Sequence, residues 1–256
     1  ATWKQAAKRC VQINPEIMSK ILTPEEIEIQ RETYKIGLET FTLYLKQNTF
    51  DDSIGELIKK LQNELNEEIE NFIEIQYDSK NAGQVYSLDI EYLEDRLLAL
   101  TEMNIVYVYK DFEINLKKLI KASYNVNAKE FYKWENIINY MRTKNIKHTE
   151  LTGYQEINEL RIVNNSIKHS TSMIDDKVKK ISEFKELKYM GHNELISFFK
   201  RVKDFPYKFI SELSSEIFKD LYEFDENRLD KIAELYALRM DKKNAEKFIK
   251  LLKLKY

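Results

Sequence analysis

The feature that most limits the fold of this chain is its lack of residues that turn the backbone. Among 256 residues there are only 5 Gly and 3 Pro, whereas average usage is about 7% and 5%. β-Sandwiches, β-barrels, dinucleotide-binding sheets and phosphate-binding loops all require glycine at turns, so these folds are disfavoured. Lys, Glu, Leu and Ile dominate instead, and they favour long amphipathic helices. The composition therefore predicts an all-α protein, a multi-helix up-down bundle with long antiparallel helices.

Helical spacing of apolar residues predicts two long helices in the N-terminal third. Thr23-Pro24-Glu25-Glu26 is typical of a helix start, with Thr as N-cap, Pro at the first helical position and Glu three residues after the cap. Asp51-Asp52-Ser53 opens a second helix that ends near Tyr77. Because the link between the two is short and polar, we expect an antiparallel hairpin over residues 1–85, packed on the core.

A third helix is expected from Ser87 to about Tyr124, after a polar linker over residues 78–84. Its centre, residues 105–109, resembles a buried strand in isolation, but apolar periodicity on both sides without Gly or Pro favours a helix. The remaining expected segments are helices over 128–144, 153–169, 193–204 and 206–222, a loop over 170–191, and two helices between 225 and 256. We therefore divide the chain into the N-terminal hairpin, a helical bundle over 86–224 and lysine-rich helices over 225–256.

Charge is spread unevenly along the chain. The net charge of −2 argues against a generally basic nucleic-acid binder. Residues 50–120, however, carry 7 basic and 16 acidic side chains, a net charge of −9, whereas residues 121–203 carry 16 basic and 10 acidic ones, a net charge of +6. We expect the middle of the chain to present a positive face that the total conceals.

Several classes of site and partner are disfavoured. No run approaches the roughly 18 apolar residues of a membrane span, so no membrane partner is expected. The single Cys10 excludes an internal disulfide and a Cys-rich zinc site, and it suits a reducing cytoplasm. His148, expected to be exposed in a basic turn, and His192, at an expected helix start, have no Cys or carboxylate at metal-ligand spacing. We therefore assign no metal and no cofactor.

The final helix has two interpretations. Phe248, Ile249, Leu251 and Leu252 stand among six lysines, a pattern found in helices that bind a membrane surface or a partner. The same pattern occurs in ordinary packing helices with a solvated face, and these are more common. The second interpretation is favoured.

One segment gathers side chains suited to phosphate chemistry on a single helix face. At about 100° per residue, Arg161, Asn165 and His169 fall within roughly 80° of one another, and Asn158 lies in the same arc. Apolar residues occupy the opposite arc. A guanidinium, an amide and an imidazole aligned in this way can hold a phosphate and move a proton near neutral pH.

An alternative is that these side chains form only the solvated face of an amphipathic helix. The adjacent Asn164 and Asn165 favour a functional role, because Asn is a poor helix former in the middle of a helix. Asn164 also lies toward the apolar arc, where its amide needs a buried partner. Locally unfavourable residues of this kind are expected at functional sites.

The run Glu159-Leu160-Arg161 through Asn164-Asn165-Ser166-Ile167-Lys168-His169-Ser170 resembles the signature region of the HEPN superfamily, the higher-eukaryote and prokaryote nucleotide-binding domains. Residues 109–117 are similar to the family's earlier long helix, and the resemblance covers roughly residues 86–224. HEPN domains are all-α bundles whose motif is Arg, usually a polar residue, and then His four to six residues further on. Many members are metal-independent RNases of toxin–antitoxin, abortive-infection and CRISPR systems, and they typically dimerise so that two motifs form one cleft.

The resemblance implies a role for each residue of the segment. His169 matches the motif histidine, a general acid or base, and Asn165 matches the polar residue that orients the phosphate. Asn164 stands where the family has arginine, and Arg161, one turn earlier on the His169 face, substitutes for it in stabilising the phosphorane charge. Lys168, Asn164 and Asn158 are the expected substrate-binding residues.

Two functions follow from the resemblance. The first is a metal-independent endoribonuclease of a bacterial or phage toxin or defence system, with RNA and a second copy of the chain as partners and a cognate antitoxin or defence-complex protein as a further one. The second is a catalytically inactive HEPN-like binding or scaffold module, such as an antitoxin or sensor, which the missing arginine at position 164 favours.

Overall fold

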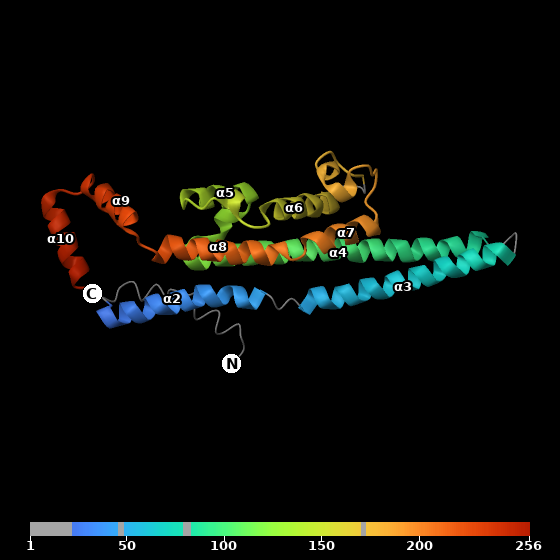
Figure 1. The fold of residues 1–256 in the computed structure, drawn as a ribbon, viewed down its shortest axis with the longest axis horizontal. Helices are drawn as coiled ribbons and strands as arrows, with labels where there is room; N and C mark the ends of the chain where they lie inside the picture. The colour runs from blue at the N-terminus through green and yellow to red at the C-terminus, as the bar shows by residue number, and fades with distance from the viewer. Residues whose placement is uncertain (1–21, 46–48, 79–82, 170–172) are drawn as a thin grey trace. The chain divides into compact units, whose positions relative to one another are not determined.

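The computed structural model describes residues 22–45, 49–78, 83–169 and 173–256 (Figure 1). Every regular element within these ranges is a helix, apart from an isolated antiparallel bridge between Met173 and Tyr189. The all-α prediction is therefore confirmed. Across the same ranges, no helix combines the length and the apolar character that a bilayer span requires.

The helices group into two compact units. In chain order they are α2 (Pro24–Leu45), α3 (Thr49–Asp78), α4 (Gly83–Tyr124), η2 (Ala128–Phe131), α5 (Trp134–Thr143), η3 (His148–Glu150), α6 (Tyr154–His169), η4 (Val178–Lys180), η5 (Ser182–Phe184), α7 (His192–Val202), α8 (Phe205–Tyr222), α9 (Glu226–Ala237) and α10 (Lys242–Lys253). Unit 1 contains the described residues up to 44 together with 119–146 and 213–256, and unit 2 contains those of 45–118 and 147–212. This grouping differs from the three consecutive segments expected from the sequence, because α2 groups with the C-terminal helices and α3 groups with most of α4.

The expected start of α2 is confirmed by a reciprocal pair of hydrogen bonds. The backbone N–H of Thr23 donates to the Glu26 carboxylate over 2.9 Å, and the backbone N–H of Glu26 donates to Thr23 Oγ1 over 3.3 Å. This capping box satisfies two of the N–H groups that a helix start leaves without intrahelical partners.

The strand-like centre of the third helix is helical, as expected. Helix α4 continues without interruption from Gly83 to Tyr124, and Ile105, Val108 and Tyr109 are buried in it. Their spacing of three and four residues places them on one helix face. Most of the expected linker at 78–84 lies outside the described residues.

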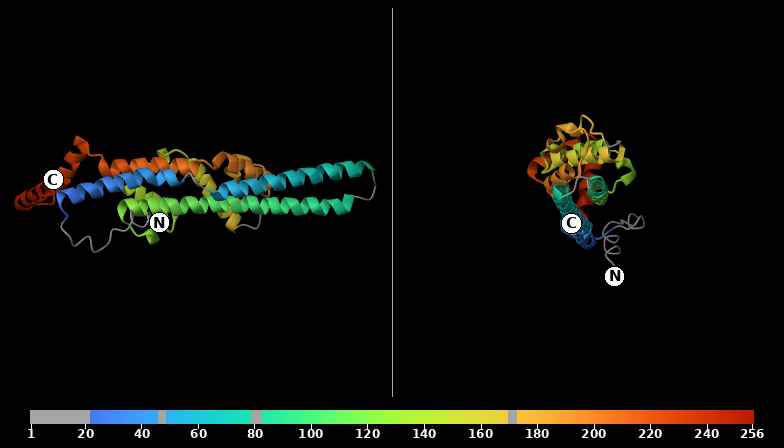
Figure 2. Two further views of the ribbon diagram at one scale, coloured as in Figure 1. Left: turned by 90° about the horizontal axis from the view of Figure 1, so that it is seen from below. Right: turned by 90° about the vertical axis from the view of Figure 1, so that its right-hand side faces the viewer.

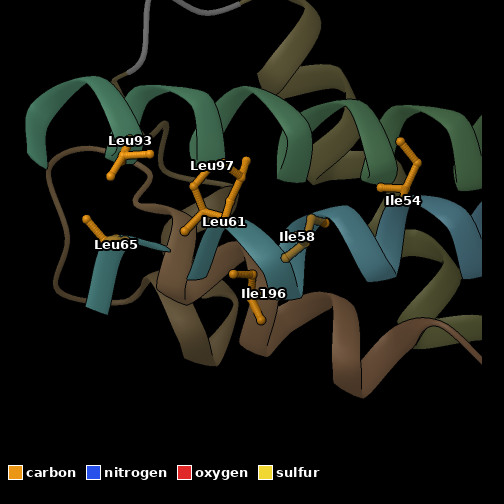
Figure 3. Close-up of a cluster of buried hydrophobic side chains, with 7 residues drawn as sticks. All are labelled: Ile54, Ile58, Leu61, Leu65, Leu93, Leu97 and Ile196. Atoms are coloured by element: carbon orange, nitrogen blue, oxygen red, sulfur yellow. The ribbon is translucent and has the colours of Figure 1, made fainter. Parts of the chain in front are cut away.

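The core of unit 2 includes a seam between α3 and residues 83–118 of α4, which run side by side in opposite directions (Figures 1 and 2). The buried side chains that form it are Ile54, Ile58, Leu61 and Leu65 from α3, Leu93 and Leu97 from α4, and Ile196 from α7 (Figure 3). Burial of each contributes about 1.5–3 kcal/mol. The periodic apolar residues of the sequence therefore form the contacts that hold this unit together.

Two expected segments differ in detail from the structure. The helix expected over 128–144 is divided into η2 and α5, and Asn136 Nδ2 donates 2.8 Å to the carbonyl of Glu130 near the break. The segment expected as a loop over 170–191 includes the short helices η4 and η5. It also buries Val178, Ile181 and Phe184. The described residues 173–191 therefore contribute to the core of unit 2 and are not simply a solvated connection.

Unit 1 is held together by polar contacts as well as apolar ones. The Tyr124 hydroxyl donates 2.7 Å to the Asp220 carboxylate. Burial and this carboxylate raise the pKa of Tyr124 well above its usual range, so the phenol remains protonated and donates. Ser214 Oγ donates to the carbonyl of Leu38 over 3.3 Å and joins α8 to α2.

The C-terminal end of α8 is capped by an arginine from the following helix. The Arg228 guanidinium donates to the carbonyls of Lys219 at 3.0 Å, Glu223 at 2.6 Å, and Asp220. Its guanidinium carbon also lies 4.2 Å from the centre of the Phe224 ring. The Lys219 carbonyl also accepts the backbone N–H of Glu223. Arg228 thus adds donors for carbonyls at the end of α8, where helical partners run out, at the negative end of the helix dipole.

Candidate functional site

The candidate site lies on α6, and a glycine in a left-handed conformation fixes where this helix begins. Gly153 has φ +85°, and its carbonyl accepts the N–H of Ile157 over 2.8 Å, the first helical bond of α6. Just before it, the N–H of Thr152 donates 2.6 Å to the Glu212 carboxylate. A Cβ at position 153 would lie 2.7 Å from Cδ1 of Phe205, so close packing and backbone conformation both require glycine here.

The rotation of α6 about its axis is set by its apolar arc. Ile157, Leu160 and Val163 are completely buried. On the other face Asn165, Lys168 and His169 are exposed, while Arg161 and Asn158 are partly buried. The expected polar face therefore exists, and its exposed part is the C-terminal end of the helix.

The structure brings together Arg161 and Asn158 but does not join Arg161 to His169. Arg161 Nη2 donates 2.8 Å to Asn158 Oδ1, which directs the guanidinium toward the start of the helix, as side chains in helices usually lean. At about 1.5 Å rise per residue, the Cα atoms of Arg161 and His169 are roughly 12 Å apart. No hydrogen bond within the described part of the chain links the two side chains. Arg161 Nε is buried and has no hydrogen-bond partner among the described residues.

Asn164 faces the interior and not the polar face. It is 1% exposed, its Nδ2 donates 3.2 Å to Asn165 Oδ1, and its own Oδ1 has no partner among the described residues. The expected buried environment is therefore present. A substrate on the surface of α6 does not reach this side chain, because Asn164 lies on the inner arc of the helix. Its contact with Asn165 instead makes it a residue that can position the Asn165 amide.

A charged cluster beside the predicted residues was not anticipated from the sequence. Arg201 on α7 donates two hydrogen bonds to Glu183 of η5, at 2.6 Å from Nε and 2.9 Å from Nη2, and its Nη2 also lies 2.8 Å from Glu159 Oε2 on α6. The guanidinium lowers the pKa of Glu183 to about 2, although burial opposes the shift. The hydrogen bonds to Glu183 and the nearby Glu159 carboxylate raise the pKa of Arg201, against its partial burial. The cluster ties α6 to α7 and η5 and so holds the candidate site in place. Its members come from three separated segments, and no local pattern in the sequence identifies them.

The other two histidines are structural in their surroundings. The expectation that His148 is exposed is wrong: it is 4% exposed and packs edge-on against the Tyr154 ring, with 5.2 Å between the ring centres. His192 is the first residue of α7, as expected. Among the residues that the structure describes, no group of three or more His, Cys, Asp or Glu side chains is placed to hold a metal ion. Cys10 lies outside the described residues.

Comparison with known proteins identifies no relative of this chain. No protein-family model, no curated protein and no solved structure matches it. The assignment of a function therefore depends on the side chains of α6 and on their chemistry.

Proposed function

We propose that the chain is a HEPN-like protein that acts on RNA, a metal-independent endoribonuclease of a bacterial or phage toxin or defence system in the cytoplasm. One observation carries the proposal: an imidazole, an amide and an ammonium group, His169, Asn165 and Lys168, are all exposed at one end of α6. A firmly packed apolar arc on the same helix holds them there. These groups are the kinds of side chain that bind a phosphodiester and transfer protons.

The reaction is transesterification within the RNA strand. The ribose 2′-OH attacks the adjacent phosphorus, the bond from phosphorus to the 5′-oxygen breaks, and the products are a 2′,3′-cyclic phosphate and a free 5′-hydroxyl. His169 serves as general base for the 2′-OH or as general acid for the leaving oxygen, an effect of about 10²–10⁴-fold on rate. Asn165 orients the phosphate, and Lys168 attracts it.

Arg161 supplies the charge that stabilises the phosphorane, provided that it leaves Asn158. From one helix, Arg161 and His169 approach a substrate at separate points, because their Cα atoms are roughly 12 Å apart. A second α6 from another copy of the chain supplies a complementary Arg and His to the same phosphate. The proposal therefore includes a homodimer.

The test is incubation of purified protein with structured and unstructured RNA in EDTA, with products identified by their 2′,3′-cyclic ends. We expect His169→Ala to reduce the rate by about 100-fold or more, and His192→Gln, a change of a histidine outside α6, to leave the rate near that of the wild type. Circular dichroism of each variant checks that it is folded. Equal cleavage by wild type and His169→Ala, or cleavage by neither, refutes the catalytic proposal.

The second candidate is a HEPN-like binding module without catalysis, acting as an antitoxin, sensor or scaffold. Two observations favour it: the residue at the family's arginine position is the buried Asn164, and the nearest arginine is held by Asn158. Gel-shift and cleavage assays on the same RNA separate the two functions. Binding without cleavage, weakened by Lys168→Ala, supports the module, and cleavage that depends on His169 excludes it.

A further inference from the structure

The β-bridge that follows α6 in the chain carries two half-exposed side chains next to each other. Met173 and Tyr189 are the bridged pair, and the N–H of Ile174 donates to the carbonyl of Lys188 over 3.1 Å. Side chains directly opposite each other in an antiparallel pair lie on the same side of it, with Cβ atoms about 4.5–5.5 Å apart. The thioether of Met173 and the ring of Tyr189 therefore lie side by side, and the two residues are 53% and 52% exposed.

The core of unit 2 anchors the bridge beneath these two side chains. The residues that follow the bridged pair along the chain, Ile174 and Met190, are only 6% and 8% exposed. Because successive side chains of an extended segment point to opposite sides, these two pack inward while the bridged pair faces solvent. Met173 and Tyr189 thus form a small apolar surface whose position is fixed by the buried residues behind it.

A cation lies over the aromatic ring of the pair. Lys188 Nζ is 5.3 Å from the centre of the Tyr189 ring, and no carboxylate of the described residues lies within ion-pair distance of this ammonium group. The segment 173–191 has five Lys and four acidic residues, and one of the four, Glu183, is paired with Arg201. The bridge therefore combines a half-exposed aromatic ring with an ammonium group that is free to contact a phosphate.

The bridge lies close to the exposed end of α6 because the chain between them is short. Only residues 170–172 separate His169 from Met173. Four steps of about 3.8 Å place the Cα atoms of these two residues at most about 15 Å apart. Neighbouring nucleotides of a stacked strand are about 3.4 Å apart along its axis, so at most about four of them separate a phosphate at His169 from a base at the bridge.

We propose that Tyr189, with Met173 beside it, is a stacking site for an unpaired base of the RNA, and that Lys188 binds an adjacent phosphate. The inference rests on the proposed action on RNA and narrows the substrate to a single-stranded segment, because bases within a duplex are stacked on one another and only unpaired bases reach a side chain in this way. Since every base has a flat face, the site selects single strands and not a particular sequence. It holds the strand beside the phosphate on which His169 acts.

The test is the binding of a short fluorescein-labelled single-stranded RNA, measured by fluorescence anisotropy, with His169→Ala in every protein so that the RNA stays intact. We expect Tyr189→Ala to weaken binding by about 5- to 100-fold, as when a stacked base loses its aromatic partner. Tyr189→Phe should bind like the parent protein, because stacking needs only the ring. The matched control is Tyr92→Ala on α4. Tyr92 is 63% exposed and has the Arg96 guanidinium 5.5 Å from its ring centre, but residues 89–95 include four acidic side chains that repel RNA.

Abasic nucleotides distinguish the loss of a stacking contact from a general loss of structure. When each position of the RNA is made abasic in turn, one position should weaken binding to the parent protein by a factor similar to that of Tyr189→Ala. The same abasic RNA should bind the Tyr189→Ala protein no more weakly than the intact RNA does, because both changes remove one and the same contact. Circular dichroism of each variant checks that it is folded.

Three outcomes overturn the stacking site and leave the nuclease standing if the wild type cleaves RNA. They are a Tyr189→Ala protein that binds like its parent, a duplex RNA that binds as tightly as the single strand, and effects of Tyr189→Ala and of the abasic nucleotide that multiply. Binding that depends on Tyr189 without any cleavage by the wild type supports the stacking site and refutes only the nuclease. A wild type that binds no RNA refutes both.

Discussion

Replacement of Gly153 by alanine tests whether the start of α6 is fixed as strictly as its geometry implies. The residue has φ +85°, a conformation that costs an L-residue about 1–2 kcal/mol. The added Cβ would lie 2.7 Å from Phe205 Cδ1 and 2.9 Å from Phe205 Cβ. The second contact cannot be relieved by rotation of the ring, because Cβ is attached to the backbone.

The magnitude follows from these two terms. Overpacking of this kind costs about 1–3 kcal/mol, so the free energy of unfolding should fall by about 2–5 kcal/mol in total. For a chain of this size each kcal/mol lowers Tm by about 2–4 °C, so we expect a drop of roughly 4–20 °C in thermal unfolding followed by circular dichroism.

The chain offers two controls for the same substitution. Gly37 in α2 and Gly55 in α3 lie inside helices, and a Cβ at either position would meet nothing within 4 Å. Gly37→Ala and Gly55→Ala should therefore each stabilise the protein by about 0.5–1 kcal/mol. The reasoning is refuted if Gly153→Ala melts with the wild type, or if all three variants shift Tm in the same direction.

Two further predictions concern charged side chains. Because Arg201 lowers the pKa of Glu183 from 4.5 to about 2, the ionised carboxylate stabilises the fold above pH 4.5 and loses this effect as the pH falls toward 2. After a discount for solvent screening, we expect Glu183→Gln to lower the free energy of unfolding, measured in urea at pH 7, by about 1–2 kcal/mol. If the variant is less stable than the wild type by the same amount at pH 2, the ionised Glu183 carboxylate is not the source of the stabilisation. Removal of the Arg228 cap by Arg228→Ala should lower the free energy of unfolding by about 1–3 kcal/mol. Arg228→Lys should recover only part of this loss, because an ammonium group lacks the forked geometry of a guanidinium. Full recovery by lysine would show that the positive charge alone stabilises the helix end.

Structural features that depend only on residues close together in the sequence were predictable. The capping box of Thr23 and Glu26 lies within four residues, and the helical centre of α4 follows from periodicity on both sides of residues 105–109. The polar face of α6 follows in the same way, since helical geometry alone places Arg161, Asn165 and His169 in one arc. Each of these features depends on residues that are neighbours along the chain.

The features that were missed depend on contacts between distant residues. His148 lies in a polar, basic stretch of sequence, which indicates exposure. Its burial against Tyr154 depends on how the short helix η3 packs beside the start of α6. Arg201, Glu159 and Glu183 come from three separate segments of the chain. Because 33% of the residues are charged, the sequence alone allows many other ion pairs equally well. The Arg161–Asn158 bond was also not predicted, although it spans only one turn and the i, i+3 rule for helices would have indicated it.

The grouping of the helices has a consequence for synthesis on the ribosome. Unit 2 consists of residues between 45 and 212, so all of its parts have been translated before unit 1 receives its last segment, residues 213–256. Helix α2 precedes the other described helices, and it must therefore wait for residues 213–256 before contacts such as the Ser214–Leu38 hydrogen bond can form. Domains generally fold in the order in which they emerge, but here the unit that contains the earliest described residues is the last to be completed. A stalled or truncated message that stops before residue 213 would yield the helix carrying His169 within a complete unit 2, while α2 would have no C-terminal partners.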